Sequence, residues 1–345
     1  MSKSIRLGLV GSPDSRRIRD FRARWLALGQ SEPIVIDYLD LPRTPPRVDV
    51  LRLDSPGENA ELAAFLIALG GGRDGVALEH GELACLREFH VGYCELLWRV
   101  ADWGLPAFNA PADIVTMFDK WQCHQHFVAA GLRRPPSVRA PSNYAQWRSE
   151  LPEQGRIFLK PLHGSSSSGV CALRWTQSRQ LLQSPLSIQS GRLYNSLRVR
   201  RYESWAQIEF ILSRLLPQGM IAETWIPKLS LAEGSVDLRI LVIGGEARHT
   251  VFRQSHSPMT NLHLGNRRAF PAGLDSTQGE AASLAVAAAA CFPDSLCVGT
   301  DVLLDGRGRA YIGEVNAFGD LLPGLMHQGD DAYTAIARAY LARMA

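Results

Sequence analysis

The chain has 345 residues, of which 46% are hydrophobic and 21% are charged. These proportions are typical of a soluble globular protein, and the length allows a large core and two or three lobes. The formal net charge of +3 gives no indication of nucleic-acid binding. The Ala-rich run 281–290 is far too short to cross a membrane. We therefore expect a protein with neither a nucleic-acid partner nor a membrane partner.

The cysteine pattern favours a reducing compartment. The six cysteines form no C-x-x-C pair, and their spacing does not match a zinc site. Reduced, mostly buried thiols are the usual state of such residues in the cytoplasm. The N-terminus leads into a short predicted strand rather than a secretory signal. We therefore predict a cytoplasmic protein.

The first third of the chain is predicted to be a small α/β unit. Residues 5–11 form a strand, 14–28 a helix and 33–37 a second strand, an order that favours a parallel sheet. The arginines of helix 14–28 are interpreted as a solvated helix face. Because Ser12 to Arg17 open this helix, they are a candidate site for a substrate anion. The polar patch at 79–82 is a second candidate for substrate contact.

The middle of the chain begins after Asn109-Ala110-Pro111 with a predicted helix at 113–130, which carries Lys120 near its middle. A short extended segment, 157–161, precedes the loop 163–169. Residues 176–190 are rich in Gln and Ser and are predicted to be an exposed excursion. A strand, a helix and a strand follow at 193–201, 203–216 and 220–226.

The last third is predicted to contain two hairpins separated by a helix. The hairpins lie at 236–254 and 297–316, with the helix near 277–290. A final helix runs from about 331 to the end.

The hairpin 297–316 allows its register to be worked out. An Asp-Gly-Arg-Gly turn separates two runs of β-branched and apolar residues. If Leu304 pairs with Arg309, Asp301 lies opposite Ile312. Side chains on one face recur every second residue, so Glu314 and Asn316 then share the face of Asp301.

Asp301, Glu314 and Asn316 together form an all-oxygen cluster on this face. Two carboxylates repel each other unless a cation lies between them, and Mg²⁺ favours oxygen ligands, often with substrate phosphates. A solvated polar face is equally compatible with this segment taken alone.

Lys160 and the loop that follows it form a candidate phosphate site. Small residues let backbone N–H groups approach phosphate oxygens, and a lysine supplies a point charge. The four loop hydroxyls belong to Ser165, Ser166, Ser167 and Ser168. A surface loop beside a solvated lysine is the alternative. Lys120, taken alone, is most simply an exposed lysine.

The segment Glu223-Thr224-Trp225-Ile226 ends at Pro227. A strand that ends in proline leaves backbone groups unpaired, and such an edge can hydrogen-bond an adenine ring while Trp225 or Ile226 packs against it. The alternative is an ordinary edge strand that the proline terminates.

The hairpin 236–254 carries two arginines whose relative orientation depends on the turn. With a two-residue turn Gly244-Gly245, Arg253 faces away from Arg239. With a three-residue turn, Asp237, Arg239 and Arg253 share one face. Both turn lengths are common, and the sequence leaves the choice open. Downstream, Asn261 is a candidate contact for a phosphate or a substrate.

Taken in order, these pieces resemble the ATP-grasp superfamily, from about Asp119 to Asn316. The resemblance is closest to the branch of glutathione synthetase and the ribosomal-protein glutamate ligases. The matching pieces are Asp119-Lys120, Lys160-Pro161 with the serine loop, Glu223 to Ile226, Asp237-Leu238-Arg239, Arg253, Asn261 with Gly265, Asp301, and Glu314-Val315-Asn316.

The resemblance implies an α/β and α+β fold of three lobes. These are a small N-terminal parallel α/β lobe at 1–112, a central α+β lobe with the phosphate loop at 113–222, and a C-terminal α+β lobe with the metal site at 223–345. The last two lobes would clasp ATP.

The resemblance also implies the cofactors and the site. Two Mg²⁺ ions, with Mn²⁺ as a substitute, would bind Asp301, Glu314 and Asn316. ATP would contact Lys120, Lys160, the serine loop and the 223–226 segment. Arg239, Arg253 and Asn261 would act on the transferring phosphoryl group.

The implied reaction is the ATP-dependent joining of a carboxylate and an amine through an acyl phosphate. The substrates would be a small-molecule or peptide carboxylate and an amine acceptor, and a homodimer would be in keeping with many relatives. The alternatives are a phosphotransferase that stops at a phosphorylated product and a nucleotide-binding module without catalysis. The segment 176–218 does not align with the well-characterised enzymes, and loop 317–324 departs from their pattern and is expected to face the substrate.

Overall fold

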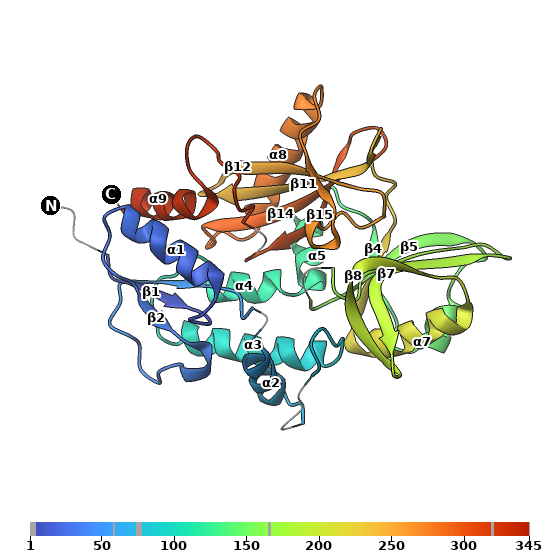
Figure 1. Cartoon of the computed structure of the whole chain (residues 1–345), viewed down its shortest axis with the longest axis horizontal. Helices are drawn as coiled ribbons and strands as arrows, with labels where there is room; N and C mark the ends of the chain where they lie inside the picture. The colour runs from blue at the N-terminus through green and yellow to red at the C-terminus, as the bar shows by residue number, and fades with distance from the viewer. Residues whose placement is uncertain (1–4, 58, 74–77, 165–166, 319–320, 345) are drawn as a thin grey trace.

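The computed structural model describes residues 5–57, 59–73, 78–164, 167–318 and 321–344. Each third of the chain contributes one sheet, and the helices cover these sheets (Figure 1). No helix in the described part of the chain combines the length and the apolar character needed to cross a bilayer.

The N-terminal sheet is parallel, as predicted. Its strands are β1 (Leu7–Val10), β2 (Ile34–Ile36) and β3 (Val50–Leu53), in the order β2-β1-β3. Helix α1 (Arg16–Ala27) begins where the Ser15 side chain accepts a hydrogen bond from the backbone N–H of Arg17. The other helices of this region are η1 (Tyr38–Asp40), α2 (Ala60–Leu69) and α3 (Leu86–Ala101).

The prediction of a single helix at 113–130 is wrong, because the structure has two helices there. They are α4 (Pro111–Met117) and α5 (Lys120–Ala129). Asp119 separates them: its Oδ1 accepts hydrogen bonds from the N–H groups of Trp121 and Gln122, at 2.8 and 3.0 Å. A carboxylate that caps two N–H groups starts a new helix, so Lys120 lies at the beginning of α5 rather than near the middle of a longer helix.

The central sheet is antiparallel, in the order β4-β9-β5-β6-β7-β8. Helices α6 (Tyr144–Ser149) and α7 (Trp205–Leu215) and the short η2 (Leu216–Gln218) accompany it. Its strands are β4 (Ser137–Arg139), β5 (Gly155–Pro161), β6 (Cys171–Trp175), β7 (Gln180–Gln189), β8 (Arg192–Tyr202) and β9 (Met220–Thr224).

The exposed excursion predicted at 176–190 is also wrong over most of its length. Strand β7 occupies residues 180–189 and pairs with both β6 and β8. Its leucines Leu181, Leu182 and Leu186 are buried. Burial of these side chains outweighs the weak strand signal of the intervening Gln and Ser residues.

The C-terminal sheet has the order β13-β12-β11-β14-β15, with β10 paired to β11. Helix α8 (Asp275–Ala289) packs on β11, β14 and β15, and α9 (Ala332–Met344) packs on β11 and α1. The strands are β10 (Ser230–Leu231), β11 (Gly234–Ile243), β12 (Glu246–Ser255), β13 (Arg267–Ala269), β14 (Cys297–Leu304) and β15 (Ala310–Asn316), with η3 (Leu262–Leu264) before β13.

The hydrophobic cores do not follow the three sheets one to one. The N-terminal and C-terminal sheets share two clusters of buried side chains, one of which joins α1 and α9. The central sheet packs with α6 and α7 around a separate cluster. The lobe boundaries at 112 and 222 stay predictions, and β9 continues the central sheet to Thr224.

Candidate active site

The carboxylates of hairpin 297–316 share one face, but the predicted register is wrong. Leu304 pairs with Ala310, not with Arg309. The register then shifts between Val302 and Asp301, so that Asp301 lies opposite Glu314 instead of opposite Ile312. This β-bulge keeps Asp301 and Glu314 on one face although the turn is one residue longer than expected.

The same shift places Asn316 opposite Gly299, two residues along the strand from Asp301. All three oxygen-bearing side chains therefore lie on the face that is away from α8. Val302, Leu304 and Ile312 occupy the other face and are buried.

A second bulge brings the arginines together in hairpin 236–254. The turn is the two-residue one, because Ile243 pairs with Glu246. The register shifts between Val242 and Ile240, and Asp237 consequently lies directly opposite Arg253. Asp237, Arg239 and Arg253 thus share one face, an outcome that we expected only from the longer turn.

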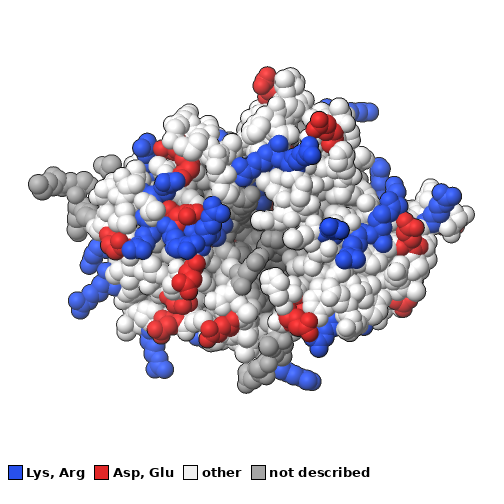
Figure 2. All heavy atoms as spheres, viewed as in Figure 1, with Lys and Arg blue, Asp and Glu red and all other residues white. Residues whose placement is uncertain are grey.

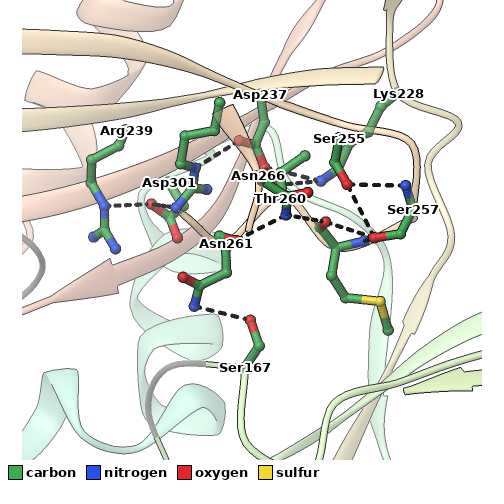
Figure 3. A network of polar contacts seen from close by, with 12 residues as sticks. Ser167, Lys228, Asp237, Arg239, Ser255, Ser257, Thr260, Asn261, Asn266 and Asp301 are labelled. Carbon is green, nitrogen blue, oxygen red and sulfur yellow. Dashed lines mark hydrogen bonds and ion pairs between the residues drawn. The ribbon is translucent and has the colours of Figure 1, made fainter. Parts of the chain in front are cut away.

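Asp237 is the centre of a buried polar network (Figure 3). Its Oδ1 accepts a hydrogen bond from Arg253 Nε at 2.8 Å, and its Oδ2 lies 3.0 Å from Lys228 Nζ. The Thr260 hydroxyl also donates to it. Burial raises the pKa of Asp237, but Arg253 and Lys228 more than offset this and hold the pKa well below its usual range.

Both arginines also face Asp301. Arg239 Nε and Arg253 Nη1 lie 3.0 and 3.2 Å from Asp301 Oδ1. Burial lowers the pKa of Arg253, but Asp237 and then Asp301 raise it above its ordinary value. Opposite charges therefore alternate across the sheet from β12 to β14, which stabilises the face.

The two lysines reach this region from the central part of the chain. Lys120 Nζ lies 3.3 Å from Glu314 Oε1 and donates to the carbonyl of Gly164 at 2.8 Å. Lys160 Nζ lies 2.5 Å from Glu223 Oε2. Burial lowers the pKa of Lys160, but Glu223 and Glu314 offset this and leave it above its usual value. Both lysines therefore lie beside the carboxylates of this region, Lys120 next to Glu314 and Lys160 next to Glu223.

The serine loop meets the C-terminal part of the chain at Ser167. Asn261 Nδ2 donates to Ser167 Oγ at 3.2 Å, and Asn195 Nδ2 donates to Ser168 Oγ at 3.0 Å. Ser165 and Ser166 lie outside the described residues. Through Ser167 and Ser168, the loop therefore contacts both the C-terminal and the central parts of the chain.

The segment 223–226 forms one wall of a small cavity. Glu223, Thr224 and Ile226 line it, whereas Trp225 packs edge-on against Phe158 with 5.0 Å between ring centroids. The cavity has a volume of about 120 Å³, and Lys120, Lys160, Ser167, Ser168, Asp301, Glu314 and Asn316 complete its wall together with Arg239, Arg253 and Asn261. The described site residues that we predicted therefore converge on one cavity, except Trp225.

Two further residues near the site, Lys228 and Arg134, carried no distinct signal in the sequence, and a third, Asp237, was given no role. Lys228 lies just after the proline of the 223–226 segment, and Arg134 Nη2 lies 3.6 Å from Glu223 Oε1. Asp237 was part of the matching pattern without a role assigned to it. Asp237 lies in β11, whereas Lys228 and Arg134 lie in loops that are distant in sequence, which is why their spacing alone does not reveal them.

A larger cavity of about 680 Å³ adjoins the small one and shares part of its wall, including Lys120, Arg239 and Glu314. Arg16 and Arg17 line it, as do 317–318 and 321–324. Residues 319–320, with Asp320, lie outside the described part of the chain. The arginine face of helix 14–28, predicted to be solvated, thus lies partly against a cavity.

The patch 79–82 ties two lobes together rather than lining either cavity. Tyr194 donates to Glu79 at 2.8 Å, and Arg192 Nη1 lies 3.3 Å from Glu79 and 3.4 Å from Glu82. These contacts account for its polar residues without a substrate.

The donor chemistry of the carboxylate face fits Mg²⁺. Asp301, Glu314 and Asn316 line one cavity, and hard divalent cations prefer side-chain oxygens as ligands. The buried Nδ2 of Asn316 has no hydrogen bond within the described residues, and a half turn of the carboxamide would exchange it for the oxygen. The nearby arginines and lysines would then face the ligand's anionic groups.

No protein-family model matches the sequence, and no curated protein matches it either. Solved structures do. D-cycloserine synthetase DcsG has a TM-score of 0.63 and 15% identity, covering 98% of this chain and 99% of its own. The ATP-grasp ligase PsnB, bound to a minimal precursor, has a TM-score of 0.57 and 16% identity over 99% of both chains. A RimK-domain ATP-grasp protein from Sphaerobacter thermophilus has a TM-score of 0.54 and 15% identity over 97% and 99%.

This chain has the ATP-grasp fold. The similarity extends over nearly the whole length of each chain, so the ATP-grasp fold includes the N-terminal lobe as well as the two sheets beside the small cavity. The fold class predicted from the sequence is confirmed.

Proposed function

We propose that this protein is an ATP- and Mg²⁺-dependent ligase that joins a carboxylate to an amine through an acyl phosphate. The observation that carries the proposal is the convergence of two lysines, two arginines and the oxygen cluster on one cavity between the central and C-terminal sheets. Solved structures with the same fold include an ATP-grasp ligase and a synthetase, which supports this chemistry.

In the proposed arrangement the small cavity holds the nucleotide. Lys120 and Lys160 neutralise phosphate charge, the loop 163–169 covers the phosphates, and the 223–226 segment meets the adenine. When bound by Asp301, Glu314 and Asn316, Mg²⁺, as one or two ions, supplies further positive charge to the phosphate oxygens, and Mn²⁺ can replace it.

The larger cavity holds the two substrates. A carboxylate oxygen attacks the γ-phosphorus, the bond to the β-phosphate oxygen breaks, and ADP leaves. The amine nitrogen then attacks the acyl carbon, phosphate leaves with the C–O electron pair, and the nitrogen loses a proton. Arg239 and Arg253 stabilise the charge on the transferring group, and Asn261 positions the loop over it.

Assays of ADP release, together with mass spectrometry of the product, test this proposal directly. A panel of amino acids and dipeptides should give ADP only with a matching carboxylate and amine, and the product should carry an amide bond. A stable phosphorylated product without an amide would favour the phosphotransferase. Nucleotide binding without turnover over the whole panel would favour a binding module.

Cytoplasmic location and homodimer formation stay predictions.

Two variants test the metal ligands. Asp301→Asn and Glu314→Gln keep the side-chain shape but remove charge, and each should lower ADP release about 100-fold or more. Asp305→Asn is the matched control, because Asp305 lies in the turn of the same hairpin and lines neither cavity. If Asp301→Asn were as active as the unchanged protein, the assignment of Asp301 as a metal ligand would be wrong.

A further inference from the structure

Three side chains that can bind a metal ion gather at the larger cavity, and none of them belongs to the proposed Mg²⁺ site. Their ligand atoms, one each from His90, Asp119 and His163, all lie within 4.8 Å of one another. His90 and His163 line the larger cavity and not the small one. Figure 2 shows a hollow at the centre of the molecule beside the charged side chains of α1, and Arg16 and Asp20 of α1 line the same cavity. The cavity therefore gives an ion a path to the two histidines.

Three separate elements hold these side chains. His90 lies on α3 of the N-terminal lobe, Asp119 lies between α4 and α5, and His163 begins the loop 163–169. Among the residues that the structure describes, no other group of three His, Cys, Asp or Glu side chains comes together within this distance. An ion bound here would therefore join the N-terminal lobe to the beginning of the phosphate loop.

The hydrogen bond of His163 leaves its other ring nitrogen free. Its Nδ1 lies 3.4 Å from the carbonyl oxygen of Phe118, and a carbonyl can only accept, so Nδ1 carries the proton. In the neutral imidazole the other nitrogen, Nε2, then has a lone pair. Histidines that bind metals usually donate their second nitrogen to a carbonyl or a carboxylate, which fixes the tautomer and the ring. His163 thus has the tautomer that metal binding through Nε2 requires.

Asp119 keeps one carboxylate oxygen for a further partner. Its Oδ1 accepts the two hydrogen bonds that cap α5. In the described part of the chain, Oδ2 accepts only from Gln122 Nε2, at 3.5 Å. The side chain is buried, and a buried carboxylate is stabilised by a cation. The charge of Lys120, the next residue, is engaged elsewhere, since its Nζ lies 3.3 Å from Glu314 Oε1.

The two histidine rings have to turn before they can bind one ion together. They are stacked, with 3.7 Å between their centroids and 12° between their planes. A ring nitrogen binds a metal in the plane of its ring, whereas stacked rings face each other with their π surfaces. The donors of a tetrahedral zinc ion lie about 3.4 Å apart, because its bonds to nitrogen are about 2.1 Å long. Binding therefore includes a side-chain rotation, and rotation of His163 acts on the first residue of the phosphate loop.

We propose that His90, Asp119 and His163 form a binding site for one divalent transition-metal ion of the zinc class. Zinc sites are built from imidazoles, carboxylates and thiolates, whereas Mg²⁺ prefers oxygen ligands alone. Because two of the three ligands line the larger cavity, the fourth position of the ion lies on the cavity side, open to water or to a substrate atom. The proposal does not rest on the ligase function, since the ion binds without nucleotide or substrate.

Cobalt binding to the full-length protein tests the site. After dialysis against a chelator, Co²⁺ is added without nucleotide and in the presence of excess Mg²⁺, which competes for any all-oxygen site. One Co²⁺ per chain should bind and give the intense visible absorption of a four-coordinate ion, and Zn²⁺ should displace it. The absence of binding, binding that Mg²⁺ prevents, or the weak absorption of a six-coordinate ion would each overturn the proposal.

Three variants and a control locate the ion. His90→Gln, His163→Gln and Asp119→Asn should each weaken Co²⁺ binding about tenfold or more, because each removes a ligand or its charge. His126→Gln is the matched control, since His126 is exposed on α5 and lines neither cavity. Asparagine caps a helix as well as aspartate does, so Asp119→Asn stays informative even if a histidine variant does not fold. Full-strength binding in Asp119→Asn, with its fold checked by circular dichroism, means that the site is assigned wrongly.

Hydrogen exchange gives a second measurement. Zn²⁺ should slow exchange in α3 and in residues 159–164 together, because the ion joins these two segments. The same slowing should occur in His126→Gln and should be absent in His163→Gln. Slowing confined to other segments would show an adventitious ion and overturn the proposal. Failure to release ADP, by contrast, removes the ligase proposal and leaves this site standing.

Discussion

At the scale of single residues, Asp237 connects more of the candidate site than any carboxylate singled out from the sequence. Arg253, Lys228 and Thr260 all contact its side chain, which is buried. Removing one partner from a buried charge network leaves the remaining charges unpaired, and that is more costly than the pair itself is stabilising. Asp237 therefore contributes to the stability of the fold, and it also lies beside the proposed phosphoryl site.

The substitution Asp237→Asn should reduce the free energy of unfolding by about 3–5 kcal/mol, because Arg253 and Lys228 then lose a buried countercharge. Urea denaturation followed by circular dichroism measures the change. Glu95→Gln is the control, since the ion pair of Glu95 with Arg99 is exposed and should contribute about 1 kcal/mol or less. Similar losses in the two variants would contradict the network.

His90 gives a pH dependence of stability. Its ring stacks on His163 with 3.7 Å between centroids. Burial, and then His163, lower the pKa of His90 from 6.5 to about 4. Below pH 6.5 the unfolded chain binds a proton that the folded chain binds only near pH 4. The free energy of unfolding should therefore decrease as the pH is lowered from 6.5 to 4, and His90 alone should account for a loss on the order of 3 kcal/mol.

The measurement is urea denaturation at pH 4.5, 5.5 and 6.5. His90→Gln should flatten the dependence, because the glutamine does not titrate. His80→Gln should leave it unchanged, since His80 is exposed. Parallel curves for His90→Gln and the unchanged protein would show that His90 is not the group responsible.

At the scale of elements, two β-bulges and one helix cap position the site. The bulges lie next to Asp301 in one hairpin and between Ile240 and Val242 in the other. Each one moves a charged side chain to the face that holds its partners, since a shift of one residue exchanges the two faces of a strand. The cap at Asp119 begins α5 at Lys120.

Asp119→Ala tests the helix cap. Loss of the two capping hydrogen bonds should reduce the free energy of unfolding by about 1 kcal/mol and raise the KM for ATP, because the first turn of α5 carries Lys120. Asn143→Ala is the matched control, since Asn143 caps α6 with a hydrogen bond from Gln146. It should lower stability similarly without changing the KM. An unchanged KM in Asp119→Ala would contradict the proposed role of Lys120.

At the scale of the whole molecule, the central lobe is the part with its own core. The N-terminal and C-terminal sheets share buried clusters, whereas the central sheet packs around a separate and smaller one. The contacts of Glu79 with Arg192 and Tyr194 connect it to the N-terminal lobe; Glu79 and Arg192 are largely exposed, whereas Tyr194 is buried. Exposed polar contacts of this kind contribute little stability.

We therefore expect the central lobe to open before the rest. Hydrogen exchange in rising urea should show β6 to β8 losing protection at a lower concentration than β11 and β14. Leu182→Ala should increase the difference between the two urea concentrations, because it removes a fully buried side chain from the central core. Leu238→Ala should decrease that difference, because it does the same in the core shared by the other two sheets. Each substitution should cost about 2–5 kcal/mol. Simultaneous loss of protection in all five strands would contradict separate cores.

The sequence alone predicted the order of most elements and most residues of the candidate site. Lys160, Asp301 and Glu314 could be named because strand alternation and turn residues act over a few positions, where the chemistry of the side chains is decisive. The same local rules failed for 176–190, where burial of three leucines in β7 outweighs the polar residues between them.

Only the tertiary structure decided the strand registers and the wall that α1 forms at the larger cavity. The two bulges lie within the β11–β12 and β14–β15 pairings, and the face of α1 at the larger cavity depends on the packing of α1 against α9. Contacts between segments far apart in the sequence, such as α1 and α9, leave no periodic pattern in either segment. The residue types of the site therefore come from the sequence, and their assembly around two adjoining cavities comes from long-range packing.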